Sequence, residues 1–416
     1  MRQVSVEVSY RFFLQAYGLI LASEVLFALI NPTYVQLFFD RHSPFVTAYH
    51  NEHQLSMLYG LFMMCSQIAG LCANIFWGWA SDKIGRKPVA ALAFIAVFIV
   101  ALGAVWGANS RLLILFISGY ILGQLLYGMF PVVIASVSSA AYHSRKKLLW
   151  IGLLQFFTGL AFVIGPYLGG LAMAKTHSFI APYYLLLYVS LPVMLLIVRY
   201  YRPNRYYTQP KVNVLKAAVF NGLWQKKILI LIILLLFDQV AWGIFFQFIQ
   251  PIVKLDFGLS VTEIGFFVSF IGMALMCSSL VLLPILQKFM SHHALYILAL
   301  LSMIFGCLGV AALSLLETHR YSALIYPLTF LVAFGDVVVF SLLVVGFSNA
   351  VPANRQGFIA GLLYTLAKGF GWGVAGVIGG IFMATSSPFV MGSAAMILAL
   401  CLAFYLVVSP TIHRRS

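Results

Sequence analysis

The stretch Gly78-Trp79-Ala80-Ser81-Asp82-Lys83-Ile84-Gly85-Arg86-Lys87-Pro88 is a short charged turn between two long apolar runs. One run covers residues 55–79 and the other covers residues 89–109. A helix needs about 20 apolar residues to cross the hydrocarbon core of a membrane. Each run is long enough for that, so we expect the turn to lie at a membrane face and to join two membrane-spanning helices.

The composition of the whole chain agrees with that reading. The 416 residues are 62% hydrophobic and 8% charged, with a mean hydropathy of +1.00, which places the chain in the membrane class. Backbone groups in lipid must be satisfied internally, so long apolar runs are helices. We therefore predict an all-α membrane protein with twelve transmembrane helices. The twelve runs cover residues 12–39, 55–79, 89–109, 112–138, 148–174, 180–199, 228–251, 262–286, 294–316, 322–349, 357–384 and 387–410.

The net charge of +15 indicates topology rather than binding to nucleic acid. Most of the 25 lysine and arginine residues fall on one side of the twelve-span arrangement. Only Arg41, Arg111, Lys175, Lys254 and Arg320 fall in or next to the loops of the other side. Because cytoplasmic loops carry the excess of basic residues, we expect both termini and the central loop in the cytoplasm. The membrane itself is expected to be a cytoplasmic or inner membrane. The basic face would also attract anionic lipid head groups.

The charged turn follows the pattern G-x-x-x-D-[R/K]-x-G-[R/K]-[R/K]. It is filled by Gly78, Asp82, Lys83, Gly85, Arg86 and Lys87. This pattern resembles the signature between spans two and three of the major facilitator superfamily of secondary transporters. The resemblance implies that Asp82 and Arg86 latch the cytoplasmic side in the outward-open state, with Asp82 near the start of a helix of the second half, where a carboxylate is favoured. Arg145, in the next cytoplasmic loop, is a further candidate for this latch.

The chain divides into two halves. A polar segment at residues 199–227 separates a six-span half at residues 1–198 from another at residues 228–416. A shift of 210 residues superposes parts of the halves: Arg145 on Arg355, Gly159 on Gly369, Gly169 on Gly379, and Gly170 on Gly380. These matches indicate an internal repeat. The resemblance implies two pseudo-symmetric six-helix bundles with the substrate near mid-membrane between them.

Span five contains a stretch rich in small residues, from Gly159 to Gly170. Its core is Gly165-Pro166-x-x-Gly169-Gly170. The stretch resembles the element associated with proton-coupled drug antiporters, although Ala161 stands where the strictest pattern has glycine. The alternative is a close helix crossing with no bearing on transport direction, because small residues let helices approach closely.

Four charged residues lie inside apolar runs: Glu24, Asp238, Asp336 and Lys368. A charge at the bilayer centre costs about 2.5 to 3.5 kcal/mol, so each is a candidate for proton coupling or substrate binding. Glu24 is either a protonation or cation-recognition site, or part of a structural ion pair. Asp238 is either a coupling carboxylate or the cap of a neighbouring helix. Asp336 and Lys368 either neutralise one another or leave Lys368 free to receive an anionic substrate.

One feature of the drug antiporters is missing. They usually carry an arginine in the middle of span four, but residues 112–138 contain neither arginine nor lysine. A proton-coupled mechanism would have to proceed without that group.

Aromatic and amide residues supply a candidate cavity lining. They are Tyr34, Gln36, Gln67, Tyr127, Gln155, Trp242, Gln247, Tyr364 and Trp372. Aromatic walls suit amphipathic or cationic organic solutes. The competing interpretation is that these residues pack between helices or anchor the chain at the membrane interface.

No phosphate-binding loop, catalytic triad or metal motif is present, so we expect neither an enzyme nor a cofactor, and the proton gradient would be the energy source. The function expected is proton-coupled export of small drug-like or amphipathic compounds by alternating access, carried out by a monomer. The alternative is proton-coupled uptake or exchange of an anionic metabolite, such as an amino acid, a carboxylate or a carboxylate siderophore. A third possibility is a transporter-like receptor that carries nothing.

Overall fold

A computed structural model describes residues 10–46, 52–140, 147–201, 226–316, 319–350 and 366–413, and within those ranges the regular structure is helical throughout. The first half contains α1 (Tyr10–Leu29), α2 (Asn31–Phe39), α3 (Glu52–Ile84), α4 (Arg86–Ser110), α5 (Leu113–Leu126), α6 (Met129–Ala140), α7 (Lys147–Thr176) and α8 (Ala181–Tyr200). The second half contains α10 (Lys226–Leu255), α11 (Val261–Cys277), α12 (Leu283–Phe289), α13 (His292–Leu315), α14 (Ile325–Ala350), α16 (Trp372–Thr385) and α17 (Ser387–His413). Short π-helical or 3₁₀ segments complete it: η1 (Ser278–Leu282), η2 (His319–Leu324) and η4 (Leu366–Gly371).

The helices agree with the twelve predicted spans. Eleven stretches of the described chain are long and apolar enough to cross a membrane, and a shorter apolar helix covers Gly369–Thr385 at the place of predicted span eleven. The predicted start of that span, at residue 357, lies outside the described residues. The all-α fold predicted from the apolar runs is confirmed.

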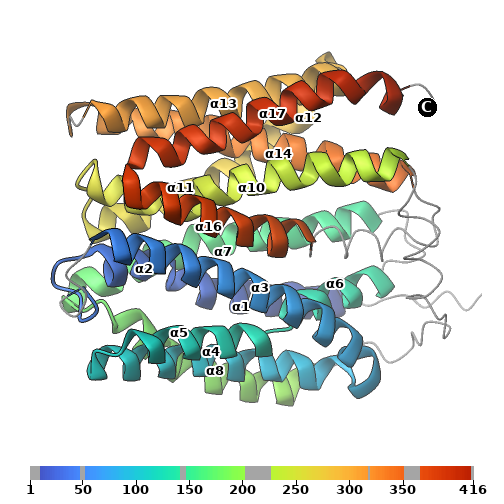
Figure 1. Ribbon diagram of the computed structural model, residues 1–416. Coiled ribbons are helices and arrows are strands. Elements are labelled where there is room, and N and C mark those ends of the chain that lie inside the picture. Colours follow the sequence, from blue (N-terminus) through green and yellow to red (C-terminus); the bar gives the residue numbers. More distant parts are fainter. Residues whose placement is uncertain are drawn as a thin grey trace, which may run out of the picture.

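Figure 1 shows the helices running side by side, with those of the second half in the upper part of the view and most of those of the first half below. We name the two ends of this arrangement by their residues. The Asp40 end carries the turns at residues 40–46, 111–112, 177–180 and 256–260. The Gly85 end carries the turn between α3 and α4. Residues 202–225, most of the predicted central segment, lie outside the described part of the chain, and the predicted division into domains stays a prediction.

Two predicted spans are each built from two helices because proline interrupts the backbone hydrogen bonds. Span one breaks between α1 and α2 at Ile30, where Pro32 has no N–H to offer the carbonyl of Ala28. Span four breaks at Tyr127 and Gly128, four and three residues before Pro131. The indole Nε1–H of Trp77 donates to the freed carbonyl of Leu125 at 2.8 Å. The second break was not predicted.

The charged turn connects α3 to α4 through one residue with a left-handed backbone. Gly85 has φ of +93°, a conformation that side chains other than glycine rarely adopt. Before it, the Lys83 ammonium lies 3.9 Å from the centre of the Trp79 ring, a cation–π contact. The side chain of Asp82 and the whole of Arg145 lie outside the described part of the chain, so the predicted latch stays a prediction.

Glycines at repeat-related positions occupy equivalent crossings between the halves. A Cβ at Gly170 of α7 would lie 3.1 Å from the Cα of Gly265 in α11. A Cβ at Gly380 of α16 would lie 2.9 Å from the Cα of Gly60 in α3. Such close approaches need small residues on both helices. The 210-residue spacing therefore corresponds to a structural equivalence.

The preceding residues of the repeat, Gly169 and Gly379, each make a close helix contact within their own half. Gly169 lies directly against the carbonyl of Leu29 in α1, and Gly379 lies directly against the ring of Phe248 in α10. Gly165 packs on Ala28, and the carbonyl of Pro166 faces Gly265. The predicted Gly165 to Gly170 element thus joins α7 both to the α1–α2 junction and to the second half.

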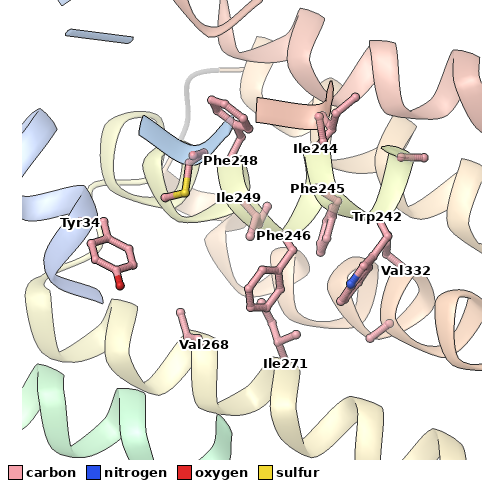
Figure 2. Packing of buried hydrophobic residues seen from close by; sticks show 14 of the residues in the cluster. Tyr34, Trp242, Ile244, Phe245, Phe246, Phe248, Ile249, Val268, Ile271 and Val332 are labelled. Carbon is pink, nitrogen blue, oxygen red and sulfur yellow. The ribbon is translucent and has the colours of Figure 1, made fainter. Parts of the chain in front are cut away.

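The second half has a core of large side chains around α10. Figure 2 shows Phe245, Phe246 and Ile249 of α10 among residues from neighbouring helices, with Trp242 beside them. Residues 241–253 of α10 are all buried, on every face of the helix. Because lipid tails are as apolar as these side chains, van der Waals packing holds the helices together. This core fixes α10, which lines a cavity between the halves and also carries the buried Asp238.

Candidate functional site

A cavity of about 240 Å³ lies between the two halves. Helices α1–α3 and α5–α7 of the first half line it together with α10, η4 and α16 of the second. Its aromatic residues are Phe27, Tyr34, Tyr59, Tyr120, Tyr127, Phe130, Phe162, Phe246 and Trp372. Its amide residues are Asn31, Gln67, Asn74, Gln124, Gln247 and Gln250.

Glu24 is the charged group of this cavity. Among the described residues of the lining it is the only one with a charged side chain. The hydroxyl of Tyr127 donates to Glu24 Oε1 at 3.1 Å, and the Phe27 ring meets the Tyr127 ring edge-on with centroids 4.4 Å apart. Tyr127 is the first residue after α5, so the break in span four brings this hydroxyl to Glu24. The arrangement is a carboxylate with two aromatic rings beside it.

A chain of hydroxyl and amide groups lines the first-half wall of the cavity. The Tyr34 hydroxyl donates to the Tyr120 hydroxyl at 2.8 Å, and Gln124 Nε2 donates to the same oxygen at 3.2 Å. Phe62 packs edge-on against Tyr34 and Tyr120 with centroids 5.6 and 4.9 Å away. The wall is therefore rigid and aromatic, with polar atoms at a few fixed points.

The structure brings together some of the predicted lining residues and places others elsewhere. Tyr34, Gln67, Tyr127, Gln247 and Trp372 line the cavity. Gln36 is buried and binds Lys254, and Trp242 stacks on Phe245 in the second-half core, 5.8 Å between centroids. Tyr364 and the side chain of Gln155 lie outside the described part of the chain.

Two aspartates meet inside the second half at a glutamine. Asp238 of α10 is fully buried and Asp336 of α14 is 8% exposed. Gln239 Nε2 donates to Asp238 Oδ2 at 3.0 Å and to Asp336 Oδ1 at 3.2 Å. Gln239 Oε1 accepts from the indole Nε1–H of Trp372 at 3.3 Å. One amide thus links the acidic pair to a ring of the cavity wall.

Asp238 makes its described hydrogen bond within its own helix. Asp238 binds the side chain of its neighbour on α10 and caps no helix among the described elements. Lys368 belongs to η4, but its side chain lies outside the described part of the chain, so both interpretations of Lys368 stay open.

The Asp40 end is closed by polar contacts between the halves. Lys254 Nζ of α10 lies 2.6 Å from Asp40 Oδ2 and 2.6 Å from Gln36 Oε1. Gln250 Nε2 donates to Asn31 Oδ1 at 3.1 Å, and the Tyr59 hydroxyl donates to the carbonyl of Gln247 at 2.8 Å. Together these contacts separate the cavity from the Asp40 end.

The Asp40 carboxylate of this ion pair stays charged near neutral pH. Burial favours a higher pKa for Asp40, but the hydrogen bonds from Lys254 and the His42 N–H, with the Lys254 charge, outweigh it and hold the pKa below its ordinary value. Because the pKa is lowered, the pair contributes fully above the ordinary carboxyl value of about 3.9 and is lost as the pH falls through the lowered pKa. A pH dependence of transport near neutrality must therefore arise elsewhere.

Replacing Lys254 by methionine should favour the conformation that is open at the Asp40 end. The change removes a partly exposed ion pair with Asp40 and a short hydrogen bond to Gln36, together about 1 kcal/mol, which shifts the population about fivefold. The measurement is the rate at which an impermeant maleimide, added from the Asp40 side, labels Ser66→Cys in the cavity of a variant without native cysteines. Lys175→Met is the matched control, and an unchanged labelling rate in Lys254→Met would contradict the assignment.

Sequence reasoning missed three residues of this region. Lys254 was assigned only to topology, and neither Tyr120 nor Gln239 was singled out within its apolar span. The available signals were weak: Lys254 lies just beyond the predicted end of span seven, and Gln239 directly follows an intramembrane aspartate.

The fold and the cavity define a multi-pass membrane protein whose two halves enclose a polar and aromatic chamber. A family model described as Major Facilitator Superfamily matches residues 16–376. The chain therefore belongs to the major facilitator superfamily of transporters, as the charged turn predicted.

Individual relatives are more distant. A segment of 122 residues is 26% identical to the "Major facilitator superfamily multidrug transporter mfsB" of Aspergillus fumigatus; it covers 29% of this chain and 19% of the fungal protein. A crystal structure of a D-xylose–proton symporter superposes with a TM-score of 0.74 at 15% identity, covering 95% of this chain and 97% of the symporter. An auto-inhibited POT family peptide transporter gives a TM-score of 0.74 at 14% identity, covering 98% and 97%. At these identities the structural likeness concerns the fold alone.

Proposed function

We propose that this protein is a secondary transporter that exports small amphipathic organic cations in exchange for protons. The observation that carries the proposal is the carboxylate of Glu24 at the wall of the aromatic cavity. A charged carboxylate attracts a cation, and aromatic faces attract both its charge and its apolar surface. The multidrug name of the fungal relative supports the same substrate class, although only over a short segment.

Proton coupling is assigned to the second-half acids. Asp238 and Asp336 are carboxyl groups that share one amide donor within a buried site. Intramembrane acids of this kind mark proton relays in pumps and transporters. In this mechanism Glu24 binds the cation, and the Asp238–Asp336 pair takes up and releases the proton.

The contacts between the halves at the Asp40 end support access to the cavity from the cytoplasm. With the predicted topology, the Asp40 end faces away from the cytoplasm, and the contacts of Lys254 close it. The described conformation then belongs to the part of the cycle in which a substrate reaches the cavity from the cytoplasm. We place the protein in the inner membrane with both termini cytoplasmic. It would act as a monomer, with the proton gradient as its energy source and no cofactor.

The test is uptake of tetraphenylphosphonium, a lipophilic aromatic cation, into everted membrane vesicles that contain the full-length protein. We expect accumulation when the vesicle interior is acidified, and loss of that accumulation with an uncoupler. Vesicles without the protein are the control. No difference between the two preparations would contradict export of cations, and stimulated movement of an anionic metabolite would favour the anion carrier instead.

A further inference from the structure

We propose that Gln239 is the positioning residue that couples the protonation of the Asp238–Asp336 pair to the shape of the cavity, through Trp372. The proposal rests on the proposed function, because it describes how proton binding at the acidic pair would be connected to the substrate cavity. Gln239 itself touches neither the cavity nor, in this proposal, the transported solute. It acts through the two groups that it binds.

The hydrogen bonds of the amide fix its orientation. An indole N–H can only donate, so Gln239 must present Oε1 to Trp372 Nε1 at 3.3 Å. Nε2 must then face the acids, where it lies 3.0 Å from Asp238 Oδ2 and 3.2 Å from Asp336 Oδ1. Both N–H groups and the carbonyl are engaged, so a change at either acid acts on all three bonds.

The start of α16 packs closely against α10 around Gln239. A Cβ at Gly371, between η4 and α16, would lie 3.1 Å from Gln239 Cβ. A Cβ at Gly243 would lie 2.8 Å from Ala375 Cβ and 3.2 Å from the Trp372 Cα. Two glycines therefore let the start of α16 approach α10 until the Trp372 indole reaches the glutamine. Gln247 Nε2 adds a hydrogen bond to the Trp372 carbonyl at 3.0 Å.

Protonation of the acids changes what Gln239 can bind. A hydrogen bond to a carboxylate is about twice as strong as one to a neutral group. When one acid takes up a proton, one of the two bonds from Nε2 weakens and the amide shifts toward the other acid. Its Oε1 then moves relative to Trp372, whose ring lines the cavity 5.4 Å from the Phe246 ring. By linkage, an occupant that displaces Trp372 acts back on the acids.

Other titratable groups face the same site and have to be considered. Asp238 interacts electrostatically with Tyr296 of α13 and Cys401 of α17 as well as with Asp336 of α14. Tyr405 of α17 stacks on Tyr296, 4.1 Å between centroids, and binds His293 Nδ1 at 3.0 Å. Lys368 of η4 has its side chain outside the described part of the chain. Of these groups, only Asp238 and Asp336 bind the amide of Gln239 in the described contacts.

The test is the fluorescence of Trp372 in the purified full-length protein without ligand. The chain has seven tryptophans, and the signal of Trp372 is the difference between a protein and its Trp372→Phe counterpart at each pH. We expect this difference to change with pH in the wild type as the acidic pair takes up a proton. The double variant Asp238→Asn with Asp336→Asn should abolish the transition, which excludes His293 and the other neighbours as its source.

Gln239→Met is the decisive variant, because it keeps the length of the side chain and removes its polar atoms. The amplitude of the transition should fall about fivefold or more. Gln287→Met, the same change at an exposed residue of α12, outside the cavity, should keep the amplitude. If Gln239→Met does not fold, Gln239→Glu provides the test. It still accepts from Trp372, but as an acid it can donate to only one aspartate, so the midpoint should shift by about one pH unit.

An undiminished transition in Gln239→Met, an unshifted midpoint in Gln239→Glu, or no transition in the wild type would each overturn the proposal. The outcome of this fluorescence test can be distinguished from the outcome of the export test. If Trp372 titrates through Gln239 while tetraphenylphosphonium movement ignores the proton gradient, the link stands and proton-coupled export fails. If export is proton-driven while Trp372 titrates without Gln239, export stands and the link fails.

Discussion

Replacing Glu24 by glutamine should weaken the binding of tetraphenylphosphonium about ten- to a hundredfold. Glutamine keeps the size of the side chain and can still accept from Tyr127, so the change removes the charge alone. The Coulomb attraction between a carboxylate and a cation about 8 Å away is about 2 kcal/mol at an effective dielectric constant of about 20, and each factor of ten in Kd is about 1.4 kcal/mol. Equilibrium binding of the radiolabelled cation to purified protein measures the effect directly.

Two controls separate charge recognition from a folding defect. Glu24→Asp keeps the charge and should recover part of the affinity. Glu263→Gln makes the same chemical change in the capping box of α11, outside the cavity, where glutamine can replace glutamate. Affinity that is unchanged in Glu24→Gln would remove Glu24 from cation recognition and return it to a structural role.

The fold could be predicted from the sequence because its main signals are local. A run of about 20 apolar residues specifies a membrane helix almost regardless of its neighbours, since no other open structure satisfies the backbone in lipid. The turn around Gly85 was predicted for a related reason, because a charged segment cannot stay in the apolar core. Even the 210-residue repeat has a physical basis in the sequence, since Gly170 and Gly380 lie at close helix crossings between the two halves.

The break in span four could not be predicted from local sequence signals. Pro131 was visible in the sequence, but many transmembrane helices keep their course through a proline. Here the Trp77 indole, 48 residues earlier in the chain, binds the freed carbonyl of Leu125, and Gly128 leaves room for the Trp77 ring. That partner comes from tertiary packing, and no pattern around Pro131 reveals it.

The candidate site was predictable in kind but not in arrangement. The cost of intramembrane charge marked Glu24, Asp238 and Asp336 individually. Which of them faces a cavity and which pair with one another depends on helix rotation and on long-range contacts, and the helices of this chain are apolar on all sides. Gln36 illustrates the limit, because its position in span one suited a cavity wall equally well, yet it binds Lys254.

Replacing Asp238 by asparagine should abolish uphill transport while leaving exchange intact. Asparagine can still accept from Gln239 through its carbonyl, so the packing around α10 is retained, but it has no proton to exchange. Without a proton to move in the opposite direction, the imposed gradient no longer drives the cation, and accumulation in everted vesicles should fall to the level without protein. Exchange of labelled for unlabelled tetraphenylphosphonium needs only alternating access, so its rate should stay within about threefold of the wild type.

The prediction compares uphill transport with exchange in the same variant. A loss of folded protein would lower both, so it cannot be mistaken for a loss of coupling. Asp256→Asn is the matched control: its carboxylate accepts from Ser387 at the Asp40 end, away from the acidic pair, and uphill transport should persist. A variant of Asp238 that loses both assays has lost a structural group, and one that keeps both carries no coupling proton. Only loss of uphill transport with exchange retained fits a carboxyl group that transfers the proton. Because the Asp40 carboxylate stays charged near neutrality, a pH dependence lost with Asp238 cannot be attributed to protonation of Asp40.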